Sequence, residues 1–202
     1  MAMDVLLALT GFCLVTSATP GPNTLMLMAS GANFGLRRTI PHLLGVVLGF
    51  GAMVAILGLG LDRLVLGNAA LAGALTWLSL AYVLWLAWKI ATAAPPAPSA
   101  ASGAASGAAP GRPLGFLAAA AFQWVNPKAW AMGLGALSAY AAGAGGAWIV
   151  AGVFVLVGLP VGVAWTATGQ GMQGLLSRPA RLRAFNATMA VVLVLSMLPV
   201  VL

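Results

Sequence analysis

Long apolar runs separated by short polar segments make up most of the chain. Six runs of about 20 residues, the length that a helix needs to cross the hydrocarbon core of a bilayer, lie at residues 5–30, 40–61, 69–91, 114–139, 147–168 and 184–202. Each run is continuously apolar, without the alternation of apolar and polar residues that marks the strands of a membrane barrel. The pattern predicts an all-α integral membrane protein with six transmembrane helices.

Proline motifs interrupt the first and fourth of these runs. The first run contains Thr19-Pro20-Gly21-Pro22-Asn23, and the fourth contains Asn126-Pro127-Lys128. Proline lacks an N–H group and collides with the carbonyl four residues earlier, so the carbonyls expected to be free are those of Thr16, Ala18 and Gln123. In a membrane, broken backbone survives where protein buries it or where it lines a watery cavity. A plain kink would explain one isolated proline, whereas two motifs at matching places favour two broken helices.

A segment rich in Ala, Pro, Ser and Gly divides the chain nearly in half. The sequence thus predicts a first three-helix repeat at residues 1–93, a flexible linker at 94–112 and a second three-helix repeat at 113–202. Because each half has an odd number of spans, a duplicated half must enter the membrane in the opposite orientation. Aligning Pro22 with Pro127 puts the two motifs at equivalent positions, which favours two inverted repeats.

Composition and charge place the chain in a membrane and orient it. The chain is 62% hydrophobic and only 5% charged, compared with roughly 25% charged in soluble domains. On so apolar a chain, a net charge of +7 is a topology signal rather than a surface for nucleic acid. With both termini outside, Arg63 alone lies on the outer side, and the cytoplasmic side holds Arg37, Arg38, Lys89, Arg112, Arg178, Arg181 and Arg183. We therefore expect both termini outside and no nucleic-acid partner.

Few side chains are suited to catalysis or to metal binding. Cys13 is the only cysteine, His42 the only histidine, and the two acidic residues, Asp4 and Asp62, lie near the ends of the predicted spans. We therefore expect no metal site, no cofactor and no enzymatic activity. The residue that would carry a coupling ion stays open: His42 has a suitable ordinary pKa of about 6.5, but lies near the start of its span, where an interfacial position is equally expected.

The broken helices offer partial charges of both signs to a ligand. The N–H groups that begin a half-helix suit a carboxylate, and the freed carbonyls suit an ammonium, so a zwitterionic amino acid satisfies both. Lys128 is the one ionisable residue placed deep in a run, and it either serves the substrate site or extends outward to the interface. The expected substrate-binding residues are Thr19, Pro20, Gly21, Pro22, Asn23, Gln123, Asn126, Pro127 and Lys128.

The two proline motifs, the Gly-rich basic turn at residues 31–38 and the GLPVGVAW stretch at residues 158–165 resemble the LysE/RhtB family of amino-acid exporters. The resemblance covers essentially the whole chain, in order. It implies secondary-active export of amino acids or small amino-acid derivatives across the bacterial cytoplasmic (inner) membrane, driven by the proton motive force, with both motifs near the translocation path. Together with exposed faces of small residues, it also makes a homodimer a candidate assembly. Glycines at small-xxx-small spacing, such as Gly45 and Gly49, are expected mainly to let helices pack closely.

Two other functions stay open from the sequence. A cation or metal exporter needs buried Asp, Glu, His or Cys ligands, which are scarce here. A non-transporting membrane scaffold has no need of two broken helices with polar residues. The peripheral acidic residues and the apolar helices favour neutral or hydrophobic amino acids over lysine or arginine as substrates.

Overall fold

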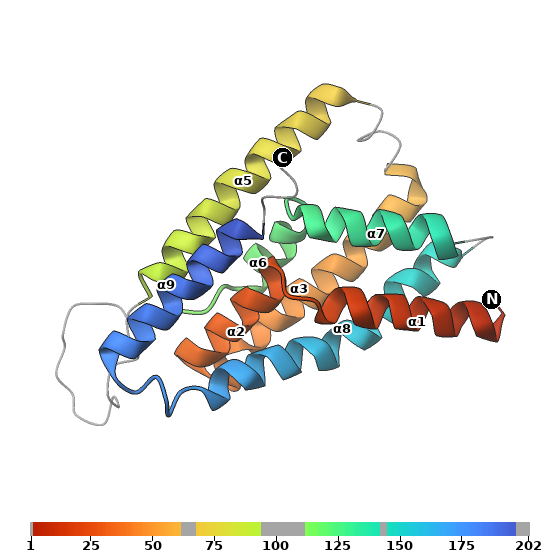
Figure 1. Cartoon of the computed structure of the whole chain (residues 1–202). Helices are drawn as coiled ribbons and strands as arrows, with labels where there is room; N and C mark the ends of the chain where they lie inside the picture. Colours follow the sequence, from red (N-terminus) through yellow and green to blue (C-terminus); the bar gives the residue numbers. More distant parts are fainter. Residues whose placement is uncertain (1, 62–67, 94–111, 142–144, 197–202) are drawn as a thin grey trace.

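A computed structural model describes residues 2–61, 68–93, 112–141 and 145–196. All regular elements in these ranges are helical (Figure 1), and the all-α prediction is confirmed for them. In chain order they are α1 (Met3–Ala18), α2 (Pro22–Phe34), α3 (Leu36–Ile56), the short π-helix η1 (Leu57–Leu61), α5 (Ala69–Ala91), α6 (Phe116–Gln123), α7 (Pro127–Tyr140), α8 (Gly146–Gly171) and α9 (Pro179–Leu195).

The first and fourth apolar runs are broken at their proline motifs, as the sequence predicts. The first run forms α1 and α2, which meet at a bend of 56°, and the fourth forms α6 and α7. By length and hydropathy, Leu36–Gly60 and Gly146–Gly171 are each able to cross a membrane, and the bent α1–α2 pair would make a third span. The full number of six spans and the inverted repeat stay predictions.

Two helices begin earlier than the apolar runs indicate. α3 starts at Leu36 and α9 at Pro179, so each first turn carries arginines that a hydropathy scan assigns to a loop. The conformation of the residues at the helix start, rather than hydropathy, determines where each helix begins. Gly35, with φ of 79°, reverses the chain before α3, and Pro179 occupies the first turn of α9, where its missing N–H costs no hydrogen bond.

Close backbone contacts hold α2, α3 and α8 side by side (Figure 1). A Cβ on Gly31 of α2 would collide with the carbonyl of Thr166 in α8, and a Cβ on Gly169 of α8 would collide with the carbonyl of Met28 in α2. Gly49 packs α3 onto α6 in the same way, with its Cβ position 2.5 Å from the Cα atom of Ala120. The small residues therefore permit close approach inside the chain.

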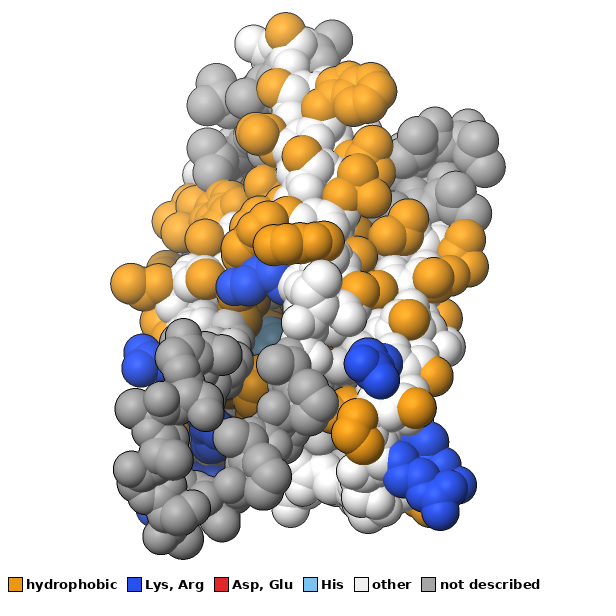
Figure 2. Space-filling model, turned by 90° about the vertical axis from the view of Figure 1, so that its left-hand side faces the viewer, with side chains coloured by type: hydrophobic (Ala, Val, Ile, Leu, Met, Phe, Trp, Pro, Cys, Tyr) orange, Lys and Arg blue, Asp and Glu red, His pale blue; other side chains and the backbone are white. Residues whose placement is uncertain are grey.

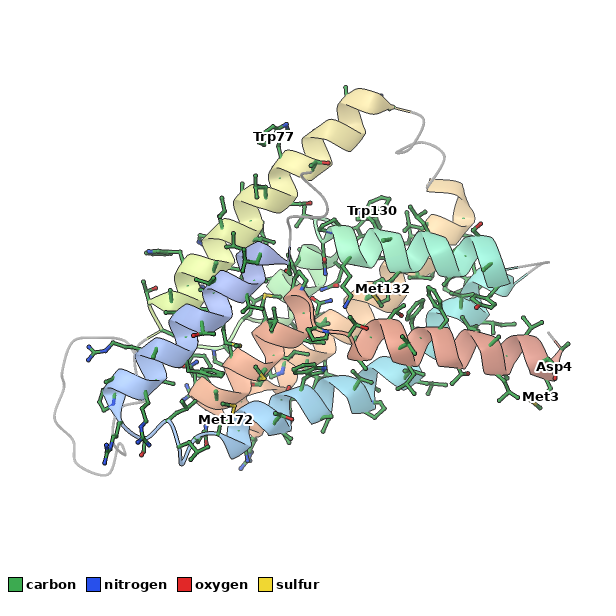
Figure 3. The ribbon with its side chains drawn as sticks, viewed as in Figure 1. Met3, Asp4, Trp77, Trp130, Met132 and Met172 are labelled. Carbon is green, nitrogen blue, oxygen red and sulfur yellow. The ribbon has the colours of Figure 1, made fainter. Side chains whose placement is uncertain are left out.

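Basic side chains gather at one end of the molecule, which we call the basic end. The α2–α3 junction, the α8–α9 junction, the end of α5 and the start of the α6 segment all lie there (Figure 1), and they carry Arg37, Arg38, Lys89, Arg112, Arg178, Arg181 and Arg183. The exposed Asp4 lies at the opposite end, at the start of α1 (Figure 3). The orientation of these two ends in the membrane stays a prediction, and Asp62, Arg63 and residues 94–111 of the linker fall outside the described residues.

Candidate functional site

The end of α1 leaves backbone carbonyls without their helical donors. Pro20 and Pro22 have no N–H group, and the amide of Gly21 donates instead to Oγ1 of Thr24 at 2.9 Å. A helical carbonyl accepts from the N–H group four residues later, so three consecutive carbonyls lose that partner. These carbonyls belong to Thr16, Ser17 and Ala18. The sequence predicted that those of Thr16 and Ala18 would lose their helical donors, and they do.

Lys128 reaches across from α7 to this broken end. Its Nζ atom donates to the carbonyl oxygen of Thr19 at 2.6 Å and lies 3.4 Å from that of Pro20. The positive charge thereby sits at the C-terminal end of α1, where the helix dipole favours a cation. An ammonium has three donors, so Nζ keeps one N–H for a ligand. The ammonium of Lys128 therefore binds the backbone at the break between α1 and α2.

Gly21 makes room for this lysine. A Cβ at residue 21 would lie 2.7 Å from Cδ and 3.0 Å from Nζ of Lys128. Its φ of −178° is extended and open to any residue, so the requirement is one of space. Gly21 thus lets α7 approach the break closely enough for the lysine to meet the carbonyls.

The second break, between α6 and α7, is closed differently. The side chain of Asn126 caps α7, with Oδ1 accepting from the backbone N of Lys128 at 3.2 Å, and Pro127 occupies the first helical position. The carbonyl of Gln123, expected to be free, accepts from the backbone N of Asn126 at 3.3 Å. That expectation is wrong because α6 ends in tight turns with donors three residues on, which satisfy the carbonyl that Pro127 cannot.

Hydrogen bonds between two side-chain amides, those of Asn23 and Gln123, link the two breaks. Nδ2 of Asn23 donates to Oε1 of Gln123 at 2.8 Å, and Nε2 of Gln123 donates back to Oδ1 of Asn23 at 3.1 Å. Gln123 is fully buried and also donates to the carbonyl of Ala119 at 2.9 Å. Gln123 therefore positions Asn23 and does not itself line the cavity beside the breaks.

A small cavity of about 60 Å³ lies against the two breaks, and we call it the central cavity. Its polar lining is Thr16, Ser17, Gly21, Asn23, Thr24, Asn126 and Lys128. Its apolar walls include Phe50 and Phe154, whose rings meet edge-on with centroids 4.8 Å apart. Met132 closes another side from α7 (Figure 3). This volume holds a few water molecules.

The predicted site residues therefore fall into two groups. Gly21, Asn23, Asn126 and Lys128 line the central cavity. The others frame it: Pro22 and Pro127 begin the two half-helices, Gln123 holds Asn23, and Thr19 and Pro20 supply the carbonyls that bind the lysine.

Sequence reasoning missed part of the lining. It missed the apolar walls, which carry no local signal. It also missed Thr24, although a threonine three residues after a helix cap is a recognisable capping pattern. Outside this site, no group of three His, Cys, Asp or Glu side chains lies together as a potential metal site within the described residues.

Apolar helices, two of them broken, whose polar ends meet at an internal cavity, define the architecture of a membrane transporter. The family model of the LysE type translocator matches residues 14–198, and the chain belongs to this family.

The chain is also similar to curated relatives from bacteria. It is 34% identical over 200 residues to the cysteine/O-acetylserine efflux proteins of Escherichia coli strain K12, Escherichia coli O9:H4 strain HS and Shigella sonnei strain Ss046. These matches cover 96% of this chain and 96% of each relative. No solved structure matches the chain.

Proposed function

We propose that this protein exports amino acids across the bacterial cytoplasmic membrane. The proposal depends on three kinds of group that lie at one cavity. They are carbonyls at the end of α1 that have no helical donor, the first amides of α2, and the ammonium of Lys128. The amides of Asn23 and Thr24 have no acceptor within α2, because the first N–H groups of a helix have none. The substrate carboxylate is placed at these amides and at Lys128, and its ammonium at the carbonyls of Thr16 and Ser17.

The same cavity favours a neutral amino acid. None of the described residues that line it is acidic, so a cationic side chain such as that of lysine would find no counter-charge among them, and it would lose hydration on entering. Leu27, Val46 and Phe50 offer apolar contact to an uncharged side chain instead. Cysteine and O-acetylserine, which the relatives are named for, are both zwitterions with small uncharged side chains. We extend that class of substrate to this chain.

The proposed cycle runs from the basic end to the opposite end, with both termini outside. The basic end faces the cytoplasm by the rule that Lys and Arg concentrate on that side. Export is driven by the proton motive force, with no carrier residue assigned. Widening of the small central cavity toward either side admits and releases the substrate.

Efflux from vesicles with a defined orientation tests this function. The protein is reconstituted into liposomes loaded with labelled L-cysteine, O-acetyl-L-serine, L-leucine or L-lysine, and a proton gradient is imposed. We expect efflux of the neutral amino acids above that of empty liposomes, little efflux of lysine, and loss of the excess when an ionophore collapses the gradient. Equal retention of all four compounds with and without the protein would end the exporter proposal. Ionophore-resistant efflux would end only the proton coupling.

A further inference from the structure

A second and larger cavity opens at the basic end of the molecule, and we call it the basic-end cavity. Its volume is about 600 Å³, within the range of small-molecule binding sites. It shares no lining residue with the central cavity. The side chains that matter for its chemistry are Ser30, Asn33, His42, Trp85, Lys89 and Arg112.

His42 lies at the inner side of this cavity with its polar atoms unused. The residue is 2% exposed, and within the described part of the chain neither Nδ1 nor Nε2 has a hydrogen-bond partner. The histidine is therefore buried inside the protein. Figure 2 shows the pale blue of a histidine inside a hollow beside a basic side chain. Buried polar groups are almost always hydrogen-bonded, so an imidazole of this kind points to a ligand that supplies the missing partner.

The rim of the cavity is basic and aromatic. Lys89 and Arg112 line it, and no acidic residue does within the described part of the chain. Nζ of Lys89 lies 4.6 Å from the ring centre of Trp85. Such a rim attracts an anionic group, since opposite charges and low-dielectric walls concentrate the field. The apolar walls formed by Met26 and Leu86 suit a ligand with an uncharged part behind its carboxylate.

The two cavities lie along the same pair of helices. In α3, His42 of the basic-end cavity lies four residues, one helical turn, before Val46 of the central cavity. In α2, Met26 and Ala29 line the basic-end cavity, while Leu27 lines the central one. A molecule in the basic-end cavity therefore lies beside the same two helices that line the central cavity.

We propose that the basic-end cavity is a loading site, where the exported amino acid binds before it passes to the central cavity. Lys89 and Arg112 draw in its carboxylate, and His42 forms a hydrogen bond with it at the inner wall. This inference rests on the proposed function and adds a second binding position to it. An anionic lipid headgroup offers the same charge, but the buried imidazole and the neighbouring Ser30 and Asn33 make the inner wall polar, which suits a small zwitterion better than an acyl chain.

Replacement of His42 separates a binding role from a structural one. His42→Leu removes a buried polar group that has no partner, so the variant should unfold at the same temperature as the wild type or higher. Its KM for O-acetyl-L-serine efflux should rise about tenfold, the loss expected for one hydrogen bond to a charged group, while kcat changes less than twofold. His42→Gln, which keeps a donor and an acceptor, should restore most of the affinity.

The rim residues are tested against a matched control at the same end. Lys89→Gln and Arg112→Gln should each raise KM, and Arg183→Gln, which removes the same charge from an exposed residue outside both cavities, should not. The efflux assays are run in phosphatidylcholine vesicles with and without phosphatidylglycerol. If His42→Leu leaves KM unchanged, or if its effect appears only when phosphatidylglycerol is present, the loading site is refuted and the proposed export stands. If the wild type moves no amino acid, both proposals fail.

Discussion

The sharpest prediction concerns the ammonium of Lys128 at the broken end of α1. Lys128→Met keeps an unbranched chain of similar length and removes the charge. In the wild type, Nζ of Lys128 donates a hydrogen bond to the carbonyl oxygen of Thr19 at 2.6 Å, and Lys128 lines the central cavity. If Lys128 also binds the substrate carboxylate, the variant should fold normally and fail to export.

The expected change in stability is small because two contributions oppose each other. Loss of a hydrogen bond from a charged donor costs about 1.5–3 kcal/mol. Removal of a charge from the predicted position of Lys128 near the middle of the bilayer returns about 2.5–3.5 kcal/mol on insertion scales. The difference is within about 2 kcal/mol, which corresponds to a shift in unfolding temperature of less than about 8 °C for a chain of this size. The loss of a charged contact to the substrate, by contrast, should lower efflux roughly 10- to 100-fold.

Efflux of O-acetyl-L-serine, divided by the amount of folded protein in the vesicles, measures the loss of transport separately from any change in stability. Arg183→Met is the control, because it removes a positive charge from an exposed residue that lines neither cavity. We expect wild-type efflux from the control. Normal efflux from Lys128→Met would show that the lysine only caps α1, and it would remove Lys128 from the substrate site.

Three other predictions follow from the same geometry. Gly21→Ala should displace the side chain of Lys128 and reduce efflux roughly tenfold without unfolding the protein, whereas Gly11→Ala, which meets no neighbouring atom, should leave efflux unchanged. Pro22→Ala should impair efflux more than Pro127→Ala, as measured in the same vesicles, because the carbonyl of Gln123 is already bonded; equal losses would contradict this reasoning. A cysteine at Ser177 should react with a membrane-impermeant thiol reagent only in inverted vesicles, and labelling in intact cells would reverse the proposed orientation.

Much of the architecture was predictable because it follows from covalent properties of single residues. Proline has no N–H group, and the motifs at Pro20, Pro22 and Pro127 marked where α1 and α6 end. A single proline does not end a helix here, since α3 and α8 continue through Pro41 and Pro160. The apolar runs located the helices for a similar reason, since hydrocarbon excludes unpaired backbone. The helix starts at Leu36 and Pro179 were missed because hydropathy reports where lipid lies and not where helical hydrogen bonds begin.

The composition of the central cavity was predictable only in part. Local motifs placed Gly21, Asn23, Asn126 and Lys128 there, whereas walls such as Phe154 come from α8 and depend on how helices pack. Packing of α8 against α2 depends on the contact of Gly169 with the backbone near Met28, a pairing that one sequence alone does not reveal. The burial of His42 depends in the same way on the neighbours of α3.

The difference between the two breaks bears on how the protein would move a zwitterion. The α1–α2 break presents free carbonyls and uncapped amides to the central cavity, while tight turns and the side chain of Asn126 satisfy the α6–α7 break. A pair of repeats related by inversion would make both breaks alike, yet here one holds most of the polar groups available to a ligand and the other mainly supplies Lys128. Because the Asn23–Gln123 amide pair links them, movement of either half-helix changes the geometry at the other. When the cavity opens, either the hydrogen bonds between Asn23 and Gln123 must break or the two breaks must move together. Substrate binding at Asn23 would therefore be coupled to the opening of the cavity through this amide pair.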